Sequence, residues 1–311
     1  MGSLAVYGEE DVTAGELTLS ELTAEAPAIT SAVEDVLARW SYVGDDPVRA
    51  VVVHGEVEAK IQSARTWLAS GRKDRRTAGT VLDVADLAED YERARTSVAV
   101  ASYVFDRFRA SLDATGEQRS HLETARAELR ERIRGQMGSL PAEDVDNPAA
   151  LVDRDVGETT GVRALASIGS EARHRANDAL EADEGPHLAS DVLGAADALV
   201  YARAFTTLRK RVEGGDDVAV ESVEDVGKLR DDAIEAVEYA RAADRGELLV
   251  RAMLPWYATE VRWTDDRLER ESGSVSVQSV AFGAIDYVVA ASTCRAVRPV
   301  SVDVATTIRD S

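Results

Sequence analysis

The chain has 311 residues, of which 45% are hydrophobic and 30% charged, a balance typical of folded rather than disordered proteins. Its 57 acidic and 36 basic residues give a net charge of -21, which disfavours nucleic acid as a partner because phosphate backbones bind to basic faces. The single cysteine, Cys294, excludes a disulfide or a cysteine-based zinc site within these residues, and its apolar surroundings predict a small buried side chain.

Helical periodicity of apolar residues begins near the start of the chain. It predicts four helices in the first half, over residues 18–40, 47–71, 77–112 and 117–134. Asp46 and Pro47 form a typical helix start, with a capping aspartate followed by proline at the first helical position. Pro27 is expected to break the first helix or to restart it.

The second half continues in the same way. Its periodicity predicts five helices, over residues 162–182, 186–212, 223–243, 247–270 and 275–297. Pro255 is expected to kink or split the fourth of these, and Pro299 to end the fifth. Residues 299–311 are therefore expected to form a tail, either frayed or a short strand.

The stretch from Gly135 to Gly161 differs from the rest because it is rich in glycine, proline and acidic residues and has little periodicity. It predicts a linker near the midpoint. We expect an N-terminal helical bundle over residues 1–135, a linker over 136–160, a C-terminal bundle over 161–298 and the tail over 299–311.

The predicted fold class is all-α, an irregular helical bundle or pair of bundles with about nine helices. Three helix–turn–helix segments are also alike in their Ala-rich helices: Ile61–Ala69 with Val81–Asp86, Ala176–Ala182 with Val192–Asp197, and Ala233–Val237 with Leu248–Val250. They resemble tetratricopeptide-type helical hairpins, and this resemblance implies a hairpin array. Their spacing is irregular, however, and the Trp-Leu-Gly-Tyr pattern of that family is absent, so both architectures stay open.

Only four of the 36 basic residues are lysine. An acidic excess with scarce lysine resembles the proteins of halophilic archaea, and the resemblance implies a surface that stays hydrated when salt screens its self-repulsion. The alternative is an acidic protein from a GC-rich genome, in which arginine codons replace lysine codons. The local basic runs, Arg72–Arg76 and Arg209–Arg211, lie at predicted helix ends, where cations complement the helix dipole.

One aromatic concentration suggests a binding site. Trp256, Tyr257 and Trp263 follow Pro255, and together with Glu260 they are candidates for lining a groove for a partner. The alternative is that these large side chains fill the space that a kink at the proline opens.

No sequence motif supports catalysis or a cofactor: the serine-hydrolase elbow, the phosphate loop and the dinucleotide turn are absent. Glu171 and His174 have the Glu-x-x-His spacing of carboxylate-bridged metal bundles, but no second such pair exists in the sequence. We therefore predict no catalytic, cofactor or metal-binding residues, with a Glu171/His174 metal site as the alternative.

Three functional hypotheses follow. The first is a non-enzymatic helical scaffold or protein-interaction module, adapted to high salt, that binds another protein or itself. The second is a metal-binding helical-bundle enzyme or carrier. The third is an exported or membrane-attached protein whose signal lies upstream of Met1, because Met1–Leu4 carries no export signal and a cytoplasmic location is otherwise expected. Val275–Val297 approaches membrane length, but its polar residues favour a buried helix.

Overall fold

The computed structural model describes residues 5–8, 11–14, 17–74, 80–142, 145, 147–157, 159–182, 185, 187–270 and 277–311. Nine α-helices account for most of these residues, so the predicted all-α class is confirmed. The chain divides into two compact units: unit 1 comprises residues 1–45 and 49–119, and unit 2 comprises residues 46–48 and 120–311.

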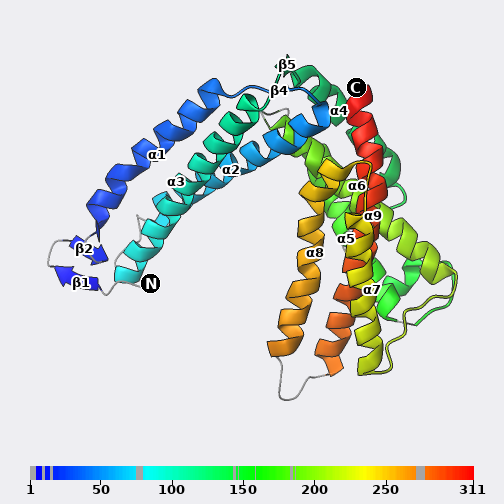
Figure 1. Cartoon of the computed structure of the whole chain (residues 1–311). Helices are drawn as coiled ribbons and strands as arrows, with labels where there is room; N and C mark the ends of the chain where they lie inside the picture. Colours follow the sequence, from blue (N-terminus) through cyan, green and yellow to red (C-terminus); the bar gives the residue numbers. More distant parts are fainter. Residues whose placement is uncertain are drawn as a thin grey trace. The chain divides into compact units, whose positions relative to one another are not determined.

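Unit 1 is built on three long helices, α1 (Leu19–Arg39), α2 (Pro47–Asp74) and α3 (Val81–Ala110), which lie side by side (Figure 1). All three contribute apolar side chains to one core, as Val33, Ile61 and Leu87 illustrate. Thr80 starts α3 with a capping box in which its side chain and that of Asp83 each accept a hydrogen bond from the other's backbone.

Short strands accompany these helices. A three-stranded antiparallel sheet of order β1-β2-β3 comprises Ala5–Gly8, Asp11–Ala14 and Leu17–Thr18. A second antiparallel pair joins β4 (Val43–Gly44) to β5 (Gly116–Glu117), so that the segment after α1 is tied to the segment after α3. Strands of two to four residues are too short to produce a visible alternation in the sequence, which is why none was predicted.

The described residues of unit 2 form six helices and one 3₁₀ turn: α4 (Arg119–Met137), η1 (Pro148–Leu151), α5 (Thr160–Glu181), α6 (Leu188–Glu213), α7 (Val223–Arg241), α8 (Glu247–Arg270) and α9 (Val277–Asp310). Helix α9 packs against α5, α6, α7 and α8 and is the central element of this unit (Figure 1). Helices α5 and α6 pack on each other, as do α7 and α8, where two of the predicted hairpins lie. That these hairpins are repeats of one unit stays a prediction.

The boundary between the two compact units differs in position from the predicted domain limits, which stay a prediction. It lies at residues 119–120, and α4 belongs to unit 2, whereas a linker was expected over 136–160. That stretch is fastened to unit 2 by two arginines. The Arg173 guanidinium donates to the carbonyl oxygens of Met137, Leu140 and Pro141, and Arg154 Nε donates to that of Val212 at 2.7 Å. Side-chain anchoring of an irregular segment leaves no periodic signal in the sequence.

The expected helix ends at proline need a correction. Pro27 lies within the continuous helix α1, and α9 runs through Pro299 to Asp310, so the predicted tail is helical. Pro255 lies within α8 and does not split it, and the kink expected there stays a prediction. By length and composition alone, Val280–Asp310 is the one helix in the described residues that could cross a membrane. This is weak evidence, because the core helix of a soluble protein meets the same criteria and α9 packs against four helices here.

Some predicted features lie outside the described residues. They are the Met1–Leu4 start, Arg75 and Arg76 of the first basic run, Pro186 at the predicted start of a helix, and the first two residues of the segment predicted from Val275.

Candidate functional site

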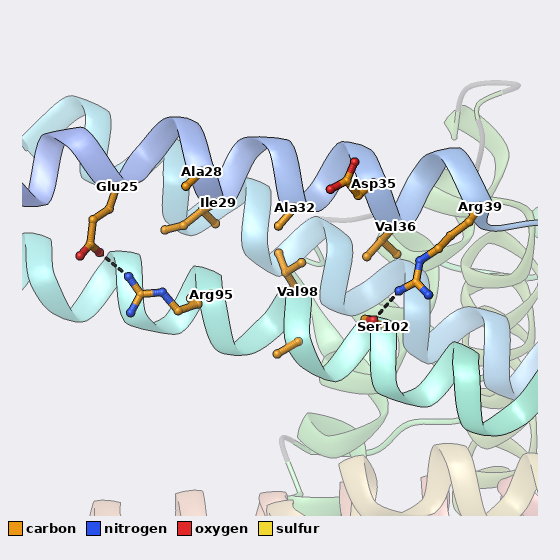
Figure 2. A pocket seen from close by; sticks show the side chains of 11 residues that line it. Glu25, Ala28, Ile29, Ala32, Asp35, Val36, Arg39, Arg95, Val98 and Ser102 are labelled. Atoms are coloured by element: carbon orange, nitrogen blue, oxygen red, sulfur yellow. Dashed lines mark hydrogen bonds and ion pairs between the residues drawn. The ribbon is translucent and has the colours of Figure 1, made fainter.

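A groove lies between α1 and α3 in unit 1 and has a volume of about 500 Å³ (Figure 2). We call it the α1–α3 groove. The two helices run parallel, because Glu25 pairs with Arg95 and, further along both helices, Arg39 Nη1 lies 2.6 Å from Asp106 Oδ1. The groove lies on one open side of the three-helix unit, and Figure 2 shows its lining side chains arranged along both helices.

The α1–α3 groove is apolar along its floor and charged at its ends. Ile29, Val36 and Val98 are buried beneath it. Small side chains at the rim keep it open: Ala28, Ala32, Ala99 and Ser102. The Glu25–Arg95 pair closes one end and Arg39, bonded to Ser102, closes the other (Figure 2). This arrangement suits an elongated apolar surface with charged flanks.

A buried aromatic cluster surrounds His54 in the same unit. Trp40 Nε1 donates to His54 Nδ1 at 2.9 Å, and His54 Nε2 lies 2.8 Å from the Val43 carbonyl oxygen. Because an indole N–H can only donate, Nδ1 is the unprotonated nitrogen and Nε2 carries the proton. Burial lowers the pKa of His54, against the opposing effect of the Val43 carbonyl. His54 is therefore a neutral structural group that holds β4 against α2.

A charged cluster lies inside unit 2 between α5, α6 and α8. The Asp197 carboxylate accepts hydrogen bonds from the Arg175 guanidinium and from the Tyr257 hydroxyl. The Arg175 guanidinium carbon also lies 4.6 Å from the centre of the Tyr201 ring, a cation–π geometry. The cluster thereby links three helices through one partly buried carboxylate.

The protonation chemistry of this cluster is that of a structural ion pair. Burial raises the pKa of Asp197, although Arg175 and Tyr257 both favour its ionised form. Burial likewise raises the pKa values of Tyr201 and Tyr257, so neither phenol ionises near neutral pH.

The predicted aromatic site is divided by the structure between surface and interior. Trp256 and Trp263 are 55% and 53% exposed and form an edge-to-face pair with ring centres 6.4 Å apart. Tyr257 points into the core toward Asp197. Glu260 is half-buried, and its pKa is raised by burial and then by the nearby Asp286 carboxylate. Binding of a partner at the two tryptophans stays a prediction.

The predicted metal pair does not assemble. His174 is exposed and its Nε2 lies 3.4 Å from Asp178 Oδ2, while Glu171 Oε1 lies 2.7 Å from Arg175 Nη2. In the part of the chain that the structure describes, no three His, Cys, Asp or Glu side chains are placed to hold a metal ion. Cys294 is buried, as predicted, and burial raises its thiol pKa.

Two family models match the chain, and they divide it close to the boundary between the units. Residues 5–114 match a domain of unknown function (DUF8262), and residues 119–306 match a second domain of unknown function (DUF8264). No curated protein and no solved structure matches the chain.

Proposed function

Since the DUF8264 model covers more than half of the chain, the protein belongs to the DUF8264 family, and we propose that it is a non-enzymatic interaction module that binds an amphipathic helix of a partner protein. The α1–α3 groove carries this proposal. It combines a concave apolar floor with charged ends, which is the pattern of helix-in-groove recognition.

The length of the groove sets the length of its occupant. Glu25 and Arg39, which mark its two ends, are fourteen residues apart on α1, equivalent to about 21 Å of helix. An occupant of about four turns would cover this distance. Its apolar residues, spaced at i, i+3 or i+4, i+7 and i+11, would contact Ile29, Val36 and Val98.

The charge at the rim further defines the partner. Arg95 pairs with Glu25, and Arg39 pairs with Asp106. Because both arginines already have an acidic partner within the protein, they do not require an acidic residue on the occupant. Asp35 also lines the groove, and no cation of the described residues forms an ion pair with it. Asp35 lies about one helical turn from Arg39 on α1, so a lysine or arginine about one turn from the corresponding end of the occupant would complement it. The expected partner helix is apolar on one face and basic beside it.

The test is selection of helical peptides against the full chain. A displayed library of 18-residue amphipathic helices, each with one lysine or arginine about one turn from an end, is selected for binding, and the affinity of selected peptides is measured by fluorescence anisotropy. Ala28→Trp fills the groove from α1, and Ala99→Trp fills it from α3; both alanines are exposed, so the core is preserved. We expect each substitution to weaken binding at least tenfold.

Ala38→Trp is the matched control, because Ala38 is also an exposed alanine of α1 but does not line the groove. It should leave the affinity unchanged. Peptides whose binding is the same for all three variants would contradict the proposal. Light scattering of the chain without peptide tests whether the groove binds a second copy of this chain instead of a partner helix. A dimer that Ala28→Trp dissociates and Ala38→Trp does not would support the second copy and contradict the partner helix.

We also propose that the module works in high salt. The net charge of -21 creates self-repulsion that salt screens, so the folded state should gain stability as salt rises. Thermal unfolding followed by circular dichroism in 0.1 M and 3 M KCl measures this. A melting temperature that is unchanged or lower in 3 M KCl would contradict the halophilic interpretation.

A further inference from the structure

A cavity of about 630 Å³ in unit 2 lies between α4, α6 and α9. We call it the cationic cavity. Its rim carries Arg132 from α4, with Arg203 and Lys210 from α6. Its floor is apolar, formed by side chains that are buried in the helix contacts, among them Leu199, Val300 and Val304. The cavity is within the size range of sites for small organic molecules.

The concentration of cations is unusual for this chain, in which acidic residues outnumber basic ones by 57 to 36. Asp303 is the one acidic residue in the lining, and its carboxylate lies 3.6 Å from Arg203 Nη1. Within the described residues, Arg132 and Lys210 form no ion pair. Three cations thus surround the cavity, and one carboxylate offsets them.

A neighbouring cavity provides an internal comparison. Its lining shares Arg203 and Thr207 with the cationic cavity and also includes Arg211 and Arg295, which are both neutralised within the protein. Arg211 Nη2 lies 2.7 Å from Asp216, and Arg295 Nη1 lies 3.0 Å from Asp232. Pairing of surface arginines with carboxylates is thus the pattern next to the cationic cavity. Arg132 and Lys210, which form no ion pair within the described residues, depart from that pattern.

The helix dipole explains only part of this cluster. Lys210 lies in the last turn of α6, where a cation is favourable. Arg203 lies ten residues before the end of the same helix, beyond the range of that effect, and Arg132 belongs to a different helix. Convergence of cations from two helices on one concave surface therefore needs a second cause.

Uncharged donors lie among the cations. Gln136 and Thr207 both line the cavity and are exposed. An amide and a hydroxyl can each donate to an oxyanion, and guanidinium groups bind carboxylates and phosphates in bidentate geometry. We propose that the cationic cavity binds a small organic polyanion, a phosphate ester or a polycarboxylate, whose apolar part rests on the floor at Leu199 and Val304.

The experiment measures binding of pyrophosphate and citrate to the full chain by isothermal titration calorimetry, in 0.2 M and 2 M NaCl. The test variant is Arg132→Gln with Lys210→Gln. The control is Arg134→Gln with Lys228→Gln, which makes the same change in net charge. Arg134 is an exposed α4 residue paired with Glu131, and Lys228 is an exposed lysine paired with Asp225, so both lie in ordinary surface pairs.

We expect saturable binding of at least one probe, weakened about a hundredfold in the test variant and unchanged in the control, since charge-assisted hydrogen bonds each contribute about tenfold or more. The affinity should fall in 2 M NaCl. Circular dichroism confirms that both variants are folded. Absence of saturable binding, or equal losses in the two variants, would overturn the assignment. A glutamate-rich peptide that binds where both small anions fail would also overturn it, in favour of an acidic protein partner.

Discussion

Acid should destabilise unit 1 through His54. The folded state holds this imidazole neutral, because Nδ1 accepts from Trp40 and the ring is fully buried among Tyr42, Phe105 and Phe108. Protonation of Nδ1 would set its N–H against the Nε1–H of Trp40, and it would bury a positive charge among aromatic rings. Burial accordingly lowers the pKa of His54 from its ordinary value of 6.5.

The sign and size of the effect follow from proton linkage. When the folded-state pKa is depressed, the unfolded chain binds more protons below pH 6.5, so the free energy of unfolding decreases as the pH falls. The slope approaches about 1.4 kcal/mol per pH unit and persists down to the folded-state pKa. Stability from this source is fully present above pH 6.5. Between pH 6.5 and 5 most carboxylates stay ionised, so the change in the free energy of unfolding over this range comes mainly from histidine.

Hydrogen exchange measured by mass spectrometry on α2 peptides reports the opening of unit 1 separately from unit 2. We expect the opening free energy of the wild-type protein to fall between pH 7.5 and 5, and His54→Gln to abolish that dependence. His174→Gln is the control, because His174 is exposed and should leave the slope unchanged. The reasoning is refuted if His54→Gln keeps the wild-type slope.

Three further predictions concern unit 2. Arg173→Met removes the donors that fasten the segment after α4, and thermal unfolding should show a loss of about 2–3 kcal/mol, with faster hydrogen exchange in that segment. Asp197→Ala leaves the partly buried Arg175 paired with Glu171 but without Asp197, and it removes the acceptor of the Tyr257 hydroxyl, so it should cost about 2–3 kcal/mol in urea unfolding, whereas Arg175→Met with Asp197→Leu should recover most of it. Gly246→Ala should lower the melting temperature, because the backbone φ is +69° and a Cβ would lie 2.8 Å from the Ser301 carbonyl carbon; the loss should be at least about 1–2 kcal/mol.

The helices could be predicted from the sequence because their apolar periodicity is strong, and the wrong helix end at Pro299 has a clear physical cause. At Pro299 the local penalty for proline, about 3 kcal/mol in a helix interior, favoured an end to the helix. The periodic pattern nevertheless continues past it through Val297, Val300, Val304 and Ile308, all buried. Burial of such side chains contributes about 1.5–3 kcal/mol each, which exceeds the proline penalty. Tertiary packing therefore overrides the local signal.

The sites were less predictable because they depend on pairs of residues distant in sequence. The aromatic concentration near Pro255 was visible, but only packing decides that Tyr257 turns inward to Asp197 while Trp256 and Trp263 stay exposed. The α1–α3 groove brings together Ala32 and Ala99, which are ordinary helix alanines until the parallel pairing of two helices places them opposite each other. Neither residue carries a signal of its own.

The net charge of the chain does not determine the electrostatic potential at each site on its surface. A total of -21 describes the field far from the protein, but at physiological ionic strength the Debye length is about 8 Å, so a bound group senses mainly the charges near it. Arg132, Arg203 and Lys210 share one cavity, where Asp303 is their single acidic neighbour in the lining. The excess of acids disfavours a long polyanion such as nucleic acid, which would cover many of them, but it does not oppose a small anion confined to that cavity. The proposal of a small polyanion in this cavity is therefore compatible with the prediction that nucleic acid is disfavoured as a partner.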